Sequence, residues 1–276
     1  MNIIPENAIL KEYGFDLIKG SSCYHYYKTV CSECGCTVYK EHRNSIVSNN
    51  SFCSKMCQAN YRHKIKDLKG VNILSHKNTN AFCYLIGLIC SDGHITYPPK
   101  YVHYSCIISI RDYDKDILYK IQNKFGGILR FNKKNVIWQL NNNKFIEYLK
   151  DIGVTHNKSL SIDVTDWFNS LTENNKLHFL RGVIDGDGSL LKNKNNNWRL
   201  CIVSGSKKFI IMCSKYLNTK YYKDRNTYAI QIAKKSELNS ILDRLYCENN
   251  ILYLERKYKK YKEQLNERVL NESKIL

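Results

Sequence analysis

Two nine-residue segments, LIGLICSDG (residues 85–93) and LRGVIDGDG (residues 180–188), align without a gap at a separation of 95 residues. Leu, Gly, Ile, Asp and Gly stand at the first, third, fifth, eighth and ninth positions of both. The apolar run predicts a helix, and Asp-Gly predicts its end. A single Asp-Gly helix end is common. Two copies in register predict two related helices, each with one aspartate at its C-terminal end.

Small residues recur four apart in both segments, as Gly87 and Ser91 in the first and as Gly182 and Gly186 in the second. This spacing places them on one face of each helix, so the two helices can approach closely and bring the aspartates together. Carboxylate and carbonyl oxygens are the ligands that Mg²⁺ prefers, and the negative end of a helix dipole favours cations. The residues therefore predict a Mg²⁺ site. Its candidate ligands are Asp92 and Asp187, with the carbonyl groups of Ser91 and Gly186.

The longer segments YLIGLICSDGHI (residues 84–95) and FLRGVIDGDGSL (residues 179–190) resemble the signature of the LAGLIDADG homing endonucleases, in the single-chain form with two motifs. Cys90 stands where that family often has Asp. The resemblance covers roughly residues 76 to 262. It implies an α+β fold of two pseudo-two-fold-related αββαββα repeats, whose antiparallel sheets bind DNA. It also implies that Asp92 and Asp187 are the essential metal-binding acids.

The same series of elements is predicted after each motif. In the first copy we expect strands at 94–98 and 101–111, a helix at 112–125, strands at 128–131 and 136–140, and a helix at 144–152. In the second copy we expect strands at 189–191 and 198–203, a helix at 207–217, strands at 221–223 and 228–233, and a helix capped by Ser236 that runs to about residue 247. A final helix at 254–271 carries alternating charges and is expected to be mostly solvated. The predicted domains are a zinc-binding module (1–70), a first repeat (76–170) and a second repeat with the C-terminal helix (171–276).

A sheet with one buried face alternates apolar and polar residues. Val136, Trp138 and Leu140 are therefore predicted to face the core, and polar residues on the other faces could contact base edges or phosphates. An ordinary solvent-facing sheet explains any one of these residues about as well. The candidates for DNA contact are Thr96, Lys100, Ser105, Ser109, Arg111, Arg130, Asn132 and Gln139 in the first copy, with Asn193, Arg199, Lys223 and Gln231 in the second.

Lys158 and Lys257 follow the last helix of the first and the second copy. The family resemblance implies a basic residue near each scissile phosphate, where it could stabilise developing negative charge. The two lysines are therefore further catalytic candidates, although coincidence explains the match nearly as well in so lysine-rich a chain.

Six of the twelve cysteines lie within the first 57 residues, and four of them form a C-x2-C, x18, C-x3-C pattern. The segment resembles treble-clef zinc fingers, in which one pair comes from a tight turn and the other from the first turn of a helix. We expect a closed structural Zn²⁺ site in this segment. Its predicted ligands are Cys31, Cys34, Cys53 and Cys57. Cys36 could replace Cys34, and Cys23 lies outside the spacing.

The net charge is +18, and +11 of it falls within residues 176–276. Such an excess favours a polyanionic partner, although codon bias in an AT-rich gene would also raise the lysine content. The N-terminus lacks the basic start and apolar run of a signal peptide, and no apolar run is long enough to span a bilayer. We therefore expect a soluble, intracellular protein with reduced thiols.

The interpretation is a site-specific double-strand DNA endonuclease of a mobile genetic element, acting as a monomer on a long asymmetric target. The alternative is an intron RNA maturase or a nuclease-inactive DNA-binding regulator on the same fold. Retention of both acids favours the nuclease. A zinc-finger regulator with a non-catalytic tail would leave the duplicated motif unexplained.

Overall fold

The computed structural model describes residues 17–19, 22–24, 26–41, 51–61, 72–96, 104–155, 158–246, 248 and 251–272. The chain divides into two compact units, Met1–Val71 and Asn72–Leu276. The first unit holds the cysteine cluster, and the second holds both motifs. Within the described ranges, no helix has both the length and the apolar character needed to span a membrane.

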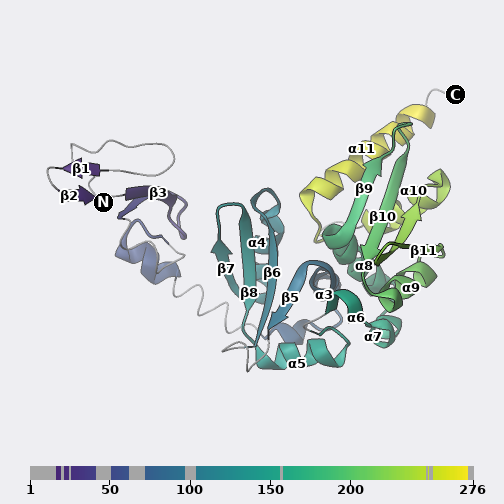
Figure 1. Ribbon diagram of the computed structural model, residues 1–276, viewed down its shortest axis with the longest axis horizontal. Helices are drawn as coiled ribbons and strands as arrows, with labels where there is room; N and C mark the ends of the chain where they lie inside the picture. Colours follow the sequence, from purple (N-terminus) through teal and green to yellow (C-terminus); the bar gives the residue numbers. More distant parts are fainter. Residues whose placement is uncertain are drawn as a thin grey trace. The chain divides into compact units, whose positions relative to one another are not determined.

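The second unit contains the predicted series of elements twice (Figure 1). The first series is α3 (Asn80–Asp92), β5 (Gly93–Thr96), β6 (Ser105–Arg111), α4 (Asp116–Phe125), β7 (Ile128–Phe131), β8 (Asn135–Leu140) and α5 (Asn143–Asp151). The second is α8 (Glu173–Asp187), β9 (Gly188–Lys192), β10 (Trp198–Ser204), α9 (Lys207–Tyr216), β11 (Tyr221–Asp224), β12 (Thr227–Ile232) and α10 (Lys235–Tyr246). Two short helices, α6 (Lys158–Ser161) and α7 (Thr165–Ser170), join the two series. The 3₁₀ turns η1 (Ile73–His76) and η2 (Asp112–Asp114) precede α3 and α4. The last helix, α11 (Glu255–Glu272), follows α10.

Each series forms a four-stranded antiparallel sheet, with strand order β5-β6-β8-β7 in the first and β11-β12-β10-β9 in the second. Val136, Trp138 and Leu140 are buried, and Leu200 and Ile202 are buried in the matching strand of the second sheet. One face of each sheet therefore packs on the helices. The opposite face, called here the outer face, carries the alternate residues. The predicted α+β fold with two such sheets is confirmed.

Three details differ from the sequence-based expectations or lie beyond the described residues. Ser236 lies inside α10 and does not precede it, because the helix begins at Lys235. The final helix, expected to be mostly solvated, also has a buried face, which Lys257, Tyr261 and Gln264 form on α11. Their i, i+4, i+7 spacing is that of an amphipathic helix, but the polar atoms of these side chains conceal the pattern. The predicted turn at residues 98–99, together with Lys100, lies outside the described residues.

The two motif helices, α3 and α8, touch backbone to backbone. A Cβ atom added at Gly87 would lie 2.0 Å from the carbonyl oxygen of Phe179, and one at Gly182 would lie 2.1 Å from that of Tyr84. No side chain fits at either position. The small-residue strips inferred from the sequence therefore do line the helix contact.

Gly182→Ala is expected to lower the melting temperature, with a loss of about 1–3 kcal/mol in the free energy of unfolding from overpacking. The higher helix propensity of Ala recovers only part of this loss. Gly186→Ala should also destabilise the contact, because an added Cβ would lie 1.9 Å from the Ser91 hydroxyl oxygen and 2.4 Å from the Ser91 Cβ, which cannot rotate away. A melting temperature of Gly182→Ala equal to that of the unchanged protein in thermal unfolding would contradict this view of the helix contact.

Candidate active site

Asp92 and Asp187 are the last residues of α3 and α8, and the next residue, Gly93 or Gly188, leaves the helix in an extended conformation. The two helix ends are adjacent, since a Cβ added at Gly186 would lie 3.3 Å from Oδ2 of Asp92. Burial raises the pKa of both carboxyl groups, and the charge of Asp187 raises that of Asp92 further. Two crowded acids with raised pKa values form a site that favours a cation.

Lys158 and Lys257 lie at these same helix ends. The Lys158 ammonium donates to the carbonyl oxygens of Cys90 at 2.7 Å and Ser91 at 2.6 Å. The Lys257 ammonium donates to four carbonyls, those of residues 184, 185, 186 and 188. Both side chains are buried, and burial lowers the pKa of Lys257 to about 8. The lysines therefore cap the negative ends of both helices, and the carbonyls of Ser91 and Gly186 accept their hydrogen bonds.

Asp185 occupies the motif position that holds Cys90 in the first copy, and it has a positioning role that the sequence did not reveal. Its Oδ2 accepts hydrogen bonds from the Tyr84 hydroxyl and the Leu254 backbone N–H, both at 2.8 Å. Burial raises the pKa of Asp185 to about 6. Because Leu254 directly precedes α11, these contacts fix the segment that carries Lys257. The only local signal was the Asp–Cys difference between the two copies.

A pocket of about 370 Å³ lies between Asp92 and the outer face of the first sheet. Asp92 lines it together with Ser109 and Arg111, which stand on that face. Arg256, which the sequence analysis had not selected, lines it as well and forms a salt bridge to Asp114 at 3.0 Å. This pair ties α11 of the second repeat to η2 of the first. A polyanion lying on the outer face would therefore reach Asp92 past two guanidinium groups.

The remaining candidates for DNA contact fall into three groups. Ser109, Arg111, Arg130 and Gln139 lie on the outer face of the first sheet, and Arg199 and Gln231 on that of the second. Thr96 and Ser105 stand at strand ends but are only 5% and 4% exposed, and the Ser105 N–H donates to the Thr96 hydroxyl at 3.1 Å. Asn132 and Asn193 follow β7 and β9, where Asn193 accepts hydrogen bonds from the backbone of its own turn.

Lys223 was expected to lie on the DNA-contacting face together with Gln231, but it lies on the opposite face of the second sheet. It pairs in register with Tyr228, whereas Tyr222 pairs with Ala229 on the outer face. A register difference of one residue exchanges the two faces of a strand. All four residues of β11 are exposed, so the sequence shows no alternation of apolar and polar residues that would indicate the inner face. The aromatic Tyr222, 45% exposed, takes the outer position.

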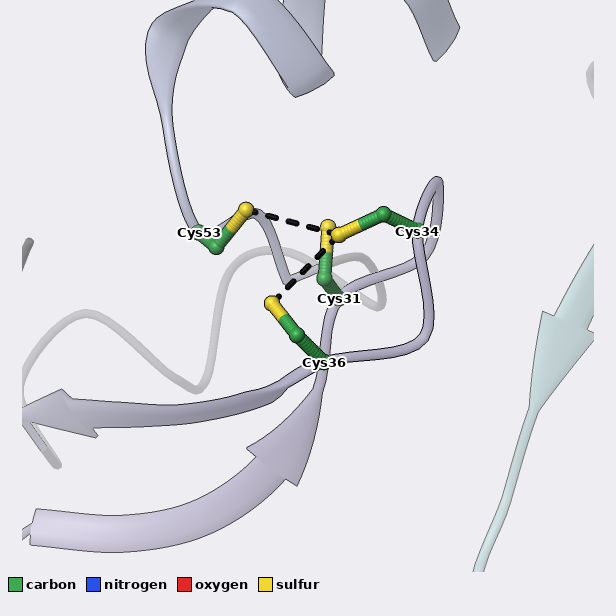
Figure 2. Close-up of side chains that lie close together, drawn as sticks. All are labelled: Cys31, Cys34, Cys36 and Cys53. Carbon is green, nitrogen blue, oxygen red and sulfur yellow. Dashed lines mark hydrogen bonds between the residues drawn. The ribbon is translucent and has the colours of Figure 1, made fainter.

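The N-terminal unit contains a cluster of cysteine sulfurs. Those of Cys31, Cys34, Cys36 and Cys53 all lie within 4.8 Å of one another and point inward (Figure 2). The first three come from the turn between β3 (Tyr26–Val30) and β4 (Thr37–Glu41), and Cys53 precedes a helical segment, residues 55–61. Cys57, in the first turn of that segment, has its sulfur 3.4 Å from that of Cys53. Tetrahedral Zn–S bonds of about 2.3 Å require sulfur separations of about 3.8 Å, which these thiols nearly have.

The backbone conformation of this unit helps to bring the cysteines together. Gly35 has φ +74°, the left-handed conformation that lets the turn bring Cys31 and Cys36 into a 2.8 Å backbone hydrogen bond. Burial raises the pKa of Cys31, but three backbone N–H groups outweigh it and bring the value down to about 6. Crowding acts the other way on Cys53 and raises its pKa to about 11. Several thiolates can coexist at this spacing only with a cation between them.

The sequence matches no protein-family model and no curated protein. Solved structures that are similar to this chain include the following two. A LAGLIDADG meganuclease, I-AabMI, bound to uncleaved DNA, has a TM-score of 0.52 at 14% identity, covering 69% of this chain and 91% of that one. The LAGLIDADG homing endonuclease I-GzeII in complex with its DNA target has a TM-score of 0.50 at 15% identity, covering 70% and 91%. The two sheets and motif helices of this chain thus have the fold of LAGLIDADG meganucleases.

Proposed function

We propose that this protein is a site-specific DNA endonuclease that hydrolyses both strands of a duplex at the paired aspartates. The observation that supports it most strongly is the pair of helix ends that places Asp92 beside Asp187. The two similar structures described above are both bound to DNA. Two non-identical repeats in one chain suit a monomer that reads a long asymmetric target.

The residues at the helix ends fit a divalent cation such as Mg²⁺. Asp92 is partly buried and Asp187 reaches solvent, and the raised pKa values of both carboxyl groups mark an environment that disfavours two negative charges without a cation. Their oxygens are the hard anionic ligands that Mg²⁺ prefers. Bound Mg²⁺ supplies Lewis-acid stabilisation of the attacking and leaving oxygens of a phosphodiester. Asp92 and Asp187 would hold this cation.

Lys158 and Lys257 have a positioning role in this proposal. Their ammonium groups fix the C-terminal carbonyls of α3 and α8, so both carboxylates stay in place when DNA binds. The same positive charges lie near enough to the acids to offset part of the rise in pKa that burial causes in Asp92 and Asp187. They would also attract the phosphates of the strand being cut.

The N-terminal unit is proposed to be a structural zinc module that adds DNA contacts beside the target read by the repeats. Cys31, Cys34 and Cys53 belong to the ligand set both by sequence spacing and by sulfur position. The fourth ligand is Cys57 by the C-x3-C spacing and Cys36 by the distances. Among the residues of the unit whose burial is described, the buried apolar side chains are Cys31, Val38 and Tyr61, and a metal link adds stability to a unit of this small size.

A binding selection followed by a cleavage assay tests the nuclease against the maturase and regulator alternatives. The protein is first used to select tight-binding sequences from a randomised duplex pool in EDTA. Addition of Mg²⁺ to the selected duplex should convert it into two fragments, and excess EDTA should stop the reaction. Selective binding without cleavage at any Mg²⁺ concentration would instead support the nuclease-inactive regulator, and selective binding of structured RNA over DNA would support the maturase.

A further inference from the structure

The outer faces of both sheets carry apolar side chains among their polar ones. Ile107, Ile128 and Ile137 are partly exposed on the first sheet. On the second, Leu191 is 41% and Val203 39% exposed. The solvated face of an antiparallel sheet is normally polar, and the core of this protein lies on the opposite side of each sheet. These five residues are called here the apolar stripe.

Strand register sets four of the five members of the stripe beside a polar group. Gln139 lies between Ile107 and Ile128, and Ile137 lies between Ser109 and Arg130. On the second sheet Leu191 lies beside Arg199, and Val203 lies in one row with Ala229 and Tyr222. Both sheets thus present apolar groups interspersed with hydrogen-bonding and cationic ones.

We propose that the apolar stripe contacts the C5-methyl groups of thymine in the DNA target. The target should then be rich in thymine at the positions that the stripe covers. This inference rests on the proposed function. Thymine is the only base that presents an apolar group on its major-groove edge. An aliphatic side chain gains free energy by covering that methyl group. Against guanine or cytosine the same side chain leaves a polar edge without a hydrogen-bond partner.

The neighbouring charges identify DNA as the occupant of this face. Arg111, Arg130 and Arg199 stand on the same outer faces as the stripe, and Arg111 also lines the pocket that leads to Asp92. A stripe made for a protein partner would not be expected to alternate with guanidinium groups in a chain of net charge +18. Phosphate neutralisation by the arginines and methyl contact by the aliphatic groups act on one duplex at once.

The test compares two randomised duplex pools, one made with thymidine and one with deoxyuridine, which lacks only the methyl group. Sequences selected from the first pool should be enriched in thymine at fixed positions. Replacing those thymines one at a time by deoxyuridine should weaken binding about fourfold for each methyl, the equivalent of roughly 0.8 kcal/mol for one buried carbon group. Selective binding with equal affinity for both forms would overturn the inference and leave the proposed nuclease standing. Absence of any selective DNA binding would overturn both.

Variants locate the effect on the stripe. Val203→Ser removes both methyl groups of the side chain and leaves one hydroxyl. It should abolish the thymine–deoxyuridine difference at one target position and retain it at the others, because no methyl group remains to cover the thymine methyl. Val269→Ser is the matched control, because Val269 is 56% exposed on α11, outside both sheets. An unchanged difference for Val203→Ser and for the corresponding Ile137→Ser would show that the stripe does not read the methyl groups.

Discussion

Asp92→Asn and Asp187→Asn are each expected to abolish double-strand cleavage while retaining selective DNA binding. Loss of one charge-stabilising donor commonly slows an enzyme by 10²–10³, and loss of a metal-binding carboxylate should slow it by at least about a thousandfold. Binding should stay equal or strengthen, because each variant removes a negative charge near the phosphates. Cleavage is measured on the selected duplex in Mg²⁺, and affinity is measured in EDTA.

Thermal unfolding excludes misfolding as the cause of that loss. Burial raises the pKa of both acids, so an uncharged amide should leave the melting temperature unchanged or higher at neutral pH. Asp151→Asn is the matched control, since Asp151 is exposed at the end of α5 and should change neither cleavage nor binding. Full cleavage by either active-site variant would refute the assignment of the acids.

Removal of zinc is expected to unfold the N-terminal unit and to leave the second unit folded. Structural zinc contributes roughly 10–16 kcal/mol in zinc-finger peptides, more than the small described core of this unit could replace. Elemental analysis should find about one zinc per chain, as for a single four-cysteine centre. Cys34→Ser and Cys53→Ser should lose the metal and bind a long target less tightly. Neither should lower the catalytic rate on a short one.

Cys36→Ser and Cys57→Ser decide the fourth ligand, because only one of them should lose zinc. Cys201→Ser is the control, since Cys201 lies in β10 of the second unit and should not affect zinc content. A zinc-free protein with an ordered N-terminal unit, measured by protection from proteolysis, would refute the metal site.

The architecture of the second unit could be predicted because its signals are local and repeated. Two copies of one apolar run ending in Asp-Gly place both helix ends, and the glycine spacing of four places both contact faces. The β8 alternation of Val136, Trp138 and Leu140 likewise gives its buried side directly. Each of these signals lies within a few residues of the feature that it predicts.

Contacts between distant segments could not be predicted in the same way. Asp185 meets Leu254 across 69 residues, and Arg256 meets Asp114 across 142. Nothing near either acid in the sequence indicates its partner. Pairing register places Tyr222, and not Lys223, on the outer face. The sequence does not indicate this register, because the four residues of this edge strand are all exposed and show no alternation of apolar and polar side chains.

The most direct test of a paired active site is the position of the cuts. The selected duplex, labelled on each strand in turn, is incubated with the protein and Mg²⁺, and both products are mapped at nucleotide resolution. Two adjacent helix ends with one aspartate each predict one cut on each strand, a few base pairs apart across the minor groove, with both cuts dependent on Mg²⁺. Cleavage confined to one strand, or no cleavage of a duplex that the protein binds selectively, would contradict the account.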